Sequence, residues 1–130
     1  MKKDYKKWHN KKTYLNNDKK RVFFHEREIW FAYVGENIGY EQDGSSKDFM
    51  RPIIILKKFN NQILWGLPLT KGPKKEKPYY YSFVFKSGIK SVAILSQIKL
   101  IDAKRLRYKT GDIKEDEFDT LKEKIRRLLA

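Results

Sequence analysis

Short runs of β-branched and aromatic residues, each closed by glycine, proline or a polar turn, limit most strongly what this chain can fold into. Such runs are typical of strands, because these side chains pack well on a pleated sheet. We expect strands at residues 28–34, 53–56, 63–69, 79–85 and 92–101, with tight turns at 60–61 and 87–88. Residues 53–56 are apolar throughout, which predicts burial on both faces. Because proline cannot donate to a ladder, the third strand should end or bulge at Pro68.

Only the C-terminal segment has the pattern of an amphipathic helix. Acidic residues at 115–117 would occupy its first turn and Arg126 and Arg127 its last, which complements the helix dipole at both ends. The apolar residues fall three and four positions apart on one face: Phe118, Leu121, Ile125, Leu128 and Leu129. Several short strands and one terminal helix predict a mainly β fold, a small and strongly bent antiparallel sheet or barrel.

Charge and composition exclude several classes of function. The 130 residues correspond to one ordinary domain, and 30 Lys and Arg against 16 Asp and Glu give a net charge of +14. Such an excess attracts polyanions. Without cysteine there is no disulfide or thiolate metal site, and the only histidines, His9 and His25, lie at or before the expected domain boundary. We expect no metal and no cofactor, since no glycine-rich phosphate-binding motif occurs either.

The N-terminal segment differs in composition from the rest. Residues 1–21 contain eight Lys, one Arg and two Asp, a net charge of +7. We expect a basic, flexible arm over residues 1–22 and a folded domain over 23–130. The arm is either a solubilising tail or a polyanion-binding one, with Tyr5, Trp8 and Tyr14 as stacking faces. No apolar run is long enough for a membrane span or a secretion signal, which predicts a cytoplasmic protein without membrane contact.

Four motifs follow one another along the domain: GYEQDG at residues 39–44, RPIIIL at 51–56, PLT at 68–70 and SVAILSQIKLID at 91–102. In this order they resemble the MazF/PemK toxins of type II toxin–antitoxin systems, over residues 26–130. The resemblance implies a small SH3-like β-barrel with a C-terminal helix, usually a two-fold dimer. It also implies sequence-selective endonucleolytic cleavage of single-stranded mRNA without a metal. The 2′-hydroxyl of the RNA would attack the adjacent phosphorus and leave a cyclic phosphate and a 5′-hydroxyl.

Two residues match the catalytic residues of this family. Arg51 precedes Pro52 as the family's catalytic arginine does, and its planar fork of donors suits two phosphate oxygens. Because a guanidinium hardly deprotonates, charge stabilisation is favoured over proton donation. Thr70 matches the threonine after the family's proline motif, and its hydroxyl would bond a phosphate oxygen or the 2′-oxygen. The structural alternatives stay open: an arginine paired with a loop carboxylate, and a threonine bonded to its own backbone.

The resemblance implies further residues that bind RNA or shape the site. Gln97, placed on the later strand, would read a base edge or orient Arg51. The others lie in two loops: Glu41 and Gln42 in one, Lys71, Lys74 and Lys75 in the next. Some PemK-like members use a histidine and an aspartate as acid and base, but Tyr40 and Ser96 occupy those positions here. The arginine and threonine scheme is the one that this sequence supports.

Three partners are implied: single-stranded RNA, a second copy of the chain, and a cognate antitoxin whose acidic, apolar-studded tail would cover Arg51. A different class of function is also compatible with the charge. A basic SH3-like module that binds RNA or DNA without cutting it, or a divergent inactive toxin homologue, would have the same composition. Cleavage of RNA by the pure protein separates these alternatives.

Overall fold

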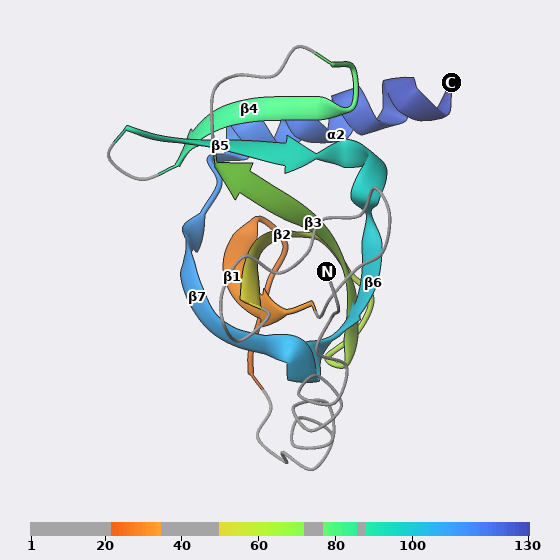
Figure 1. Cartoon of the computed structure of the whole chain (residues 1–130). Coiled ribbons are helices and arrows are strands. Elements are labelled where there is room, and N and C mark those ends of the chain that lie inside the picture. The colour runs from red at the N-terminus through yellow and green to blue at the C-terminus, as the bar shows by residue number, and fades with distance from the viewer. Residues whose placement is uncertain (1–21, 35–49, 72–76, 86–87) are drawn as a thin grey trace, which may run out of the picture.

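Seven antiparallel strands and a C-terminal helix form the part of the chain that the computed structural model describes, residues 22–34, 50–71, 77–85 and 88–130 (Figure 1). The elements are β1 (Glu28–Tyr33), β2 (Met50–Lys58), β3 (Ile63–Lys71), β4 (Tyr80–Phe85), β5 (Ile89–Ile94), β6 (Lys99–Asp102), β7 (Leu106–Asp112) and α2 (Glu115–Leu129). Two short 3₁₀ turns, η1 (Leu95–Gln97) and η2 (Ala103–Arg105), come before and after β6.

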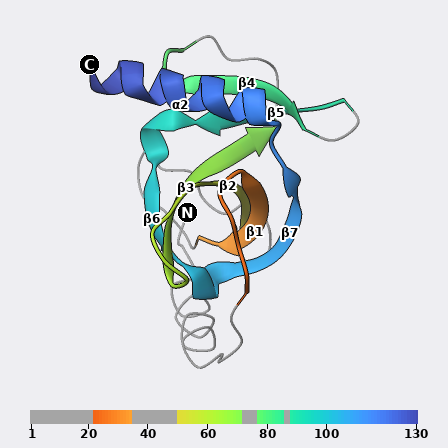
Figure 2. The ribbon, with the colours of Figure 1, turned by 180° about the vertical axis from the view of Figure 1, so that it is seen from behind.

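The strands form one strongly curled sheet. Its hydrogen-bonded order is β4-β5-β3-β2-β1-β7, and β6 pairs with the first half of β3. Strands β1, β2, β3, β6 and β7 curve around a common interior, while β4 and β5 extend across one end, where α2 lies along them (Figures 1 and 2). The predicted bent antiparallel sheet with a C-terminal helix is confirmed. Within the described residues no ladder joins β6 to β7, so closure into the predicted barrel is not seen.

The central strands are buried on both faces and thereby separate two hydrophobic cores. The outer core lies under α2 and consists mainly of Ile29, Ile54, Leu56, Leu67, Leu69, Tyr81, Phe83, Ala93, Leu95, Ile113, Phe118 and Leu121. The inner core fills the curl with Phe24, Trp30, Ala32, Ile53, Ile55, Leu64, Ile101, Ala103 and Leu106. Residues 53–56 contribute to both cores in alternation, which confirms the prediction from their unbroken apolar run.

The predicted strand over residues 92–101 is wrong, because the chain turns a corner there. β5 ends at Ile94, the turn η1 follows, and β6 begins at Lys99. Both strands pair with β3, since Ala93 lies opposite Leu69 and Lys99 lies opposite Gly66. The prediction that β3 ends or bulges at Pro68 is also wrong, because β3 continues to Lys71. The register shift in its ladder with β2 lies between Ile55 and Lys57. The break lies instead between β5 and β6, which both pair with β3. Pro68 of β3 lies beside this break and has no amide hydrogen to donate to a neighbouring strand.

The strands predicted at 28–34, 63–69 and 79–85 are present within one or two residues of their predicted ends, and the strand predicted at 53–56 is longer, from Met50 to Lys58. Ser87 of the turn predicted at 87–88 lies outside the described residues. Asn60 forms the predicted turn, because its Oδ1 accepts hydrogen bonds from the amides of Gln62 (2.7 Å) and Ile63 (2.9 Å). The apolar face of α2 is covered only in part: Phe118 and Leu121 are buried, whereas Leu129 is 82% exposed. No helix in the described part of the chain is long and apolar enough to cross a membrane.

Candidate active site

Arg51 and Thr70 lie at the same end of two neighbouring antiparallel strands. Arg51 is the second residue of β2, and Thr70 is the second-last residue of β3. The ladder between these strands ends at the pair of Ile53 and Pro68, and each predicted catalytic residue lies two positions beyond that pair. Because side chains alternate along a strand, both belong to the sheet face on which Ile53 and Pro68 lie. The fold therefore places two residues that are 19 positions apart in the sequence at the same end of β2 and β3, where they line separate cavities.

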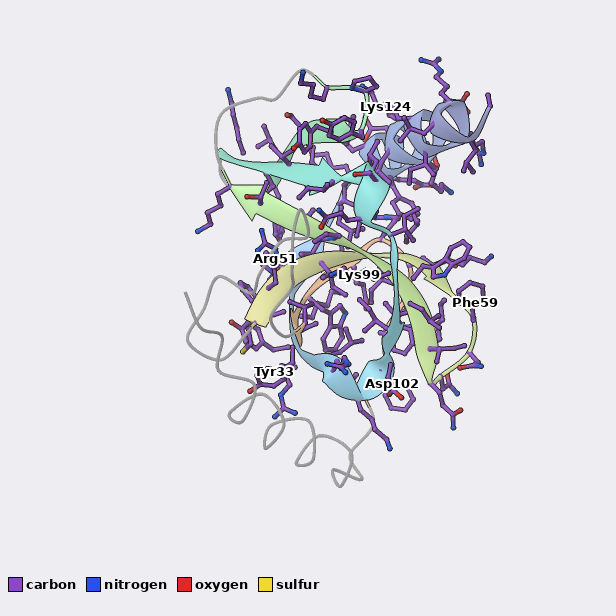
Figure 3. The ribbon with its side chains drawn as sticks, turned by 45° about the vertical axis from the view of Figure 1, so that its right-hand side comes forward. Tyr33, Arg51, Phe59, Lys99, Asp102 and Lys124 are labelled. Carbon is purple, nitrogen blue, oxygen red and sulfur yellow. The ribbon has the colours of Figure 1, made fainter. Side chains whose placement is uncertain are left out.

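Arg51 is buried at the rim of the inner core. Its exposed fraction is 5%, although it carries a full charge. Together with Lys99 it lines a small cleft, the Arg51 cleft, whose other walls are Val34, Ile53, Gly66, Pro68 and Ile101. Figure 3 shows Arg51 at the beginning of β2 with Lys99 nearby on β6. Two cations thus share one cleft with apolar walls, where charges are screened less than in water.

Gly66 is required for the close packing beneath this cleft. A Cβ atom at Gly66 would lie 2.7 Å from Cδ1 of Ile101 and 2.9 Å from Cδ1 of Ile53. Both distances are shorter than an ordinary carbon–carbon contact of about 3.5–4.0 Å. The absence of a side chain at this position lets the two isoleucines meet over the backbone of β3.

Thr70 lines a larger pocket, the Thr70 pocket, of about 370 Å³. The Thr70 hydroxyl donates to the backbone carbonyl of Lys71 at 3.4 Å, a long and weak bond that a ligand can replace. The described residues that line the Thr70 pocket are Ile29, Phe31, Pro52, Leu69, Thr70, Lys71, Phe85, Ser91, Tyr108, Lys109 and Thr110. An apolar floor with a few polar groups at its edge is typical of small-ligand sites, whose volumes are about 300–1,000 Å³.

The other predicted site residues are only partly brought together. Lys71 is exposed and lines the Thr70 pocket beside Thr70. The placement of Gln97 on a strand is wrong: it is the last residue of η1, half-buried, and lines neither the Arg51 cleft nor the Thr70 pocket. Gln97 lies in the corner between β5 and β6 and therefore belongs to neither of their ladders with β3. Glu41, Gln42, Lys74 and Lys75 lie outside the described residues.

Lys99 is the site residue that the sequence analysis missed. It lies in the matched motif SQIKLID, but only its pairing with Gly66 of β3 places it beside Arg51. The register of β6 depends on the corner at η1, which strand propensity does not reveal. The position of Lys99 beside Arg51 could therefore not be predicted from the local sequence.

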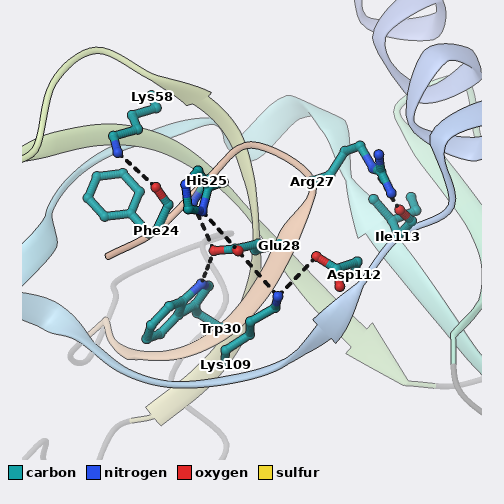
Figure 4. A network of polar contacts seen from close by, with 9 residues as sticks. All are labelled: Phe24, His25, Arg27, Glu28, Trp30, Lys58, Lys109, Asp112 and Ile113. Atoms are coloured by element: carbon teal, nitrogen blue, oxygen red, sulfur yellow. Dashed lines mark hydrogen bonds and ion pairs between the residues drawn. The ribbon is translucent and has the colours of Figure 1, made fainter. Parts of the chain in front are cut away.

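A polar network lies at the beginning of β1 (Figure 4). Glu28, 8% exposed, accepts hydrogen bonds from the His25 amide (2.8 Å) and from Trp30 Nε1 (3.0 Å). Lys109 lies 3.2 Å from the second oxygen of Glu28 and 3.3 Å from Asp112. Burial acts to raise the pKa of Glu28, but these hydrogen bonds outweigh it and the pKa is lowered. The network therefore stabilises the ionised carboxylate.

The hydrogen bond to Glu28, more than any other interaction, raises the pKa of Lys109. The Lys109 ammonium group forms ion pairs with Glu28 and Asp112, while another part of the residue lines the Thr70 pocket. Among the described residues, no group of three or more His, Asp or Glu side chains is placed to hold a metal ion.

Comparison with known proteins places this architecture in one family. Over residues 25–129 the sequence matches the family model described as PemK-like, MazF-like toxin of type II toxin–antitoxin system. No curated protein sequence matches significantly. The MazF structure from Deinococcus radiodurans (Form-I) is similar in fold, with a TM-score of 0.63 at 18% identity, covering 85% of this chain and 98% of that one.

Two mycobacterial structures have the same fold. Toxin MazF-mt6 of Mycobacterium tuberculosis matches with a TM-score of 0.60 and 17% identity, over 79% of this chain and 96% of its own. An endoribonuclease from a mycobacterial species, solved with its cognate antitoxin, matches with a TM-score of 0.61 and 10% identity, over 82% and 95%. The match of the family model to nearly the whole described fold shows that this chain belongs to the PemK-like, MazF-like toxins of type II toxin–antitoxin systems.

Proposed function

We propose that this toxin is a metal-independent endoribonuclease that cuts single-stranded mRNA at the strand ends that carry Arg51 and Thr70. The placement of these two residues at the same end of β2 and β3, at positions that match the family's catalytic pair, is the observation that carries the proposal. The 2′-oxygen forms a bond to the adjacent phosphorus, the bond from phosphorus to the 5′-oxygen breaks, and the proton lost from the 2′-hydroxyl is balanced by one gained at the 5′-oxygen. The products are a 2′,3′-cyclic phosphate and a 5′-hydroxyl.

Arg51 and Lys99 would stabilise the charge that develops on the phosphorane. Arg51 offers several N–H donors in one plane, which suits two phosphate oxygens at once. Its low exposure strengthens this effect, since preorganised charges act more strongly where water is excluded. Pro68, on the wall of the Arg51 cleft, lies two residues before Thr70.

Thr70 would position the reacting groups. Its hydroxyl can donate to a phosphate oxygen or accept from the 2′-hydroxyl once it gives up the weak bond to Lys71. Lys71, exposed on the wall of the same pocket, would contact a neighbouring phosphate. The Thr70 pocket would then hold the nucleotide beside the cut.

The proposed partners follow from the family and from the charge of the chain. A second copy would complete a two-fold dimer, and a cognate antitoxin would block the RNA site with an acidic tail. The endoribonuclease from a mycobacterial species was solved with its antitoxin, and a MazE–MazF structure from Deinococcus radiodurans has the same fold as this chain at 16% identity. Light scattering at high micromolar concentration tests the dimer, and a monomer there would contradict it.

The activity is tested by incubating the purified protein with a long single-stranded RNA in EDTA. We expect discrete fragments, and sequencing of their ends should show 5′-hydroxyl termini and a short common motif at the cuts. Strict dependence on Mg²⁺, or 5′-phosphate termini, would contradict the proposed chemistry. RNA that is bound but left intact would instead support a non-catalytic RNA-binding module.

A further inference from the structure

Two stacked aromatic rings form one wall of the Thr70 pocket. Phe31 of β1 and Tyr108 of β7 lie opposite each other in the ladder, with ring centroids 5.0 Å apart and planes inclined by 24°. On its other side Phe31 lies opposite Pro52 of β2. Because opposed residues share a face of the sheet, three adjacent strands present a row of flat apolar groups to the pocket.

The stack is open toward solvent at its outer ring. Phe31 is half-buried and covers one side of Tyr108, while Tyr108 remains 52% exposed. A tyrosine held against a second ring has little conformational freedom left to lose, so a flat ligand can stack on it at low entropic cost. The exposed ring of Tyr108 is therefore a preorganised surface on which a planar group can stack.

The rest of the pocket determines which planar group this is. Among the described lining residues the only charged ones are Lys71 and Lys109, and none is acidic. Thr70, Ser91 and Thr110 add hydroxyl groups to the lining. A flat apolar surface beside a cation and hydroxyl groups matches a nucleotide, in which a flat base is joined to a sugar and an anionic phosphate.

We infer that Tyr108, backed by Phe31, is a base-stacking platform that holds one nucleobase of the bound strand in the Thr70 pocket. The inference rests on the proposed function in taking the bound polymer to be single-stranded RNA. Stacking on an aromatic ring accepts any base, so the platform supplies affinity and position more than sequence selectivity. It orients the nucleotide, while Lys71 holds its phosphate.

A second exposed aromatic provides a matched control. Phe59 lies just beyond the far end of β2 from Arg51 (Figure 3) and makes an edge-to-face contact with Trp65 at 5.0 Å. At 45% it is nearly as exposed as Tyr108, but it does not line the Thr70 pocket. Phe59→Leu therefore removes an exposed ring of similar size without touching the proposed platform.

The test measures binding of ten-nucleotide 2′-O-methyl oligouridine and oligoadenosine, whose blocked 2′-oxygens cannot react. We compare wild type, Tyr108→Leu, Tyr108→Phe and Phe59→Leu by fluorescence anisotropy at two salt concentrations. We expect Tyr108→Leu to weaken binding of both oligonucleotides by about 5- to 150-fold at an unchanged salt slope, the effect of losing one base stack. Tyr108→Phe and Phe59→Leu should bind like wild type.

An oligonucleotide without bases separates stacking from backbone contacts. Wild type and Tyr108→Leu should bind an abasic 2′-O-methyl strand equally weakly. Equal affinity of Tyr108→Leu and Phe59→Leu for the oligonucleotides, or a change of oligomeric state in Tyr108→Leu, would overturn the platform. If RNA is cleaved normally by Tyr108→Leu at limiting and saturating protein, the platform fails and the proposed function stands. If wild type cuts no RNA but binds oligonucleotides through Tyr108, the proposed function fails and the platform stands.

Discussion

Arg51 and Thr70 each lie two residues beyond the last pair of the ladder between β2 and β3, and so lie at the same end of two antiparallel strands. The two residues differ in their surroundings. Arg51 is 5% exposed in a narrow cleft, whereas Thr70 is half-buried on the wall of a pocket of about 370 Å³. The Arg51 cleft and the Thr70 pocket share no lining residue, so a bound strand would have to pass over the strand ends to reach both.

Removal of the Thr70 hydroxyl should slow the reaction with little effect on folding. Thr70→Val keeps the shape of the side chain but deletes the hydrogen-bonding group. We expect the single-turnover rate to fall about 10- to 100-fold, somewhat less than the loss of an oxyanion-hole donor. Thr120→Val, on α2, is the control because its hydroxyl donates to the helix backbone and Thr120 does not line the Thr70 pocket. Equal rates for the two variants would exclude Thr70 from catalysis.

Lys99 should contribute to catalysis through its position beside Arg51. Lys99→Met keeps the length of the side chain and removes its charge, so less positive charge faces the developing phosphorane. We expect a lower single-turnover rate at saturating protein and a salt slope of RNA binding reduced by about one. Lys122→Met, which makes the same charge change on α2, should leave the rate unchanged. A wild-type rate in Lys99→Met would show that Lys99 is not part of the site.

Glu28 should make the stability of the fold depend on pH. Its pKa is lowered in the folded state, so its contribution is fully present above the ordinary pKa of 4.5 and is lost as the pH falls through the lower, folded value. Glu28→Gln should reduce the free energy of unfolding at pH 7 by about 1–3 kcal/mol, the typical loss for a buried hydrogen-bonded charge.

Urea unfolding of wild type and Glu28→Gln between pH 3 and pH 7 measures this effect. The difference between the two proteins should shrink as the solution becomes acidic, because the wild-type carboxyl then becomes neutral. A difference that stays constant over this range would show that the ionised form of Glu28 is not what stabilises the network.

The basic N-terminal segment should affect RNA affinity but not the chemical step. Deletion of residues 2–20 removes eight Lys and two Asp, a net charge of +6. Fewer phosphates can then be neutralised, so affinity and its salt dependence should both fall, while the rate at saturating protein stays the same. Unchanged affinity at low salt would identify the segment as a solubilising tail.

Several parts of the fold could be predicted because they depend on local patterns. The burial of residues 53–56 on both faces of the sheet and the helix 115–129 follow from runs and spacings that are visible in the sequence. β7 gave no such signal, since Lys109 and its polar neighbours form a strand only by pairing with β1. The corner at η1 depends equally on tertiary contacts, because it lets one stretch of chain pair with both halves of β3.

The site could be predicted only where a motif marked it. Arg51 and Thr70 were identified from the resemblance of their surroundings to the MazF/PemK toxins. The burial of Arg51, the approach of Lys99 and the stack of Phe31 on Tyr108 depend on which strands become neighbours. A single sequence does not reveal which strands are neighbours in the sheet, so these three features could not be predicted from it.

The most direct test of the account is the single-turnover cleavage rate of Arg51→Ala at saturating protein in EDTA, with folding checked by circular dichroism. One cation out of 30 is removed, so RNA binding should change little and its salt slope should fall by about one. The cleavage rate should fall by at least 10²–10³-fold, roughly the value of one strong transition-state contact. A folded Arg51→Ala protein that cuts bound RNA at the wild-type rate would contradict the proposed active site.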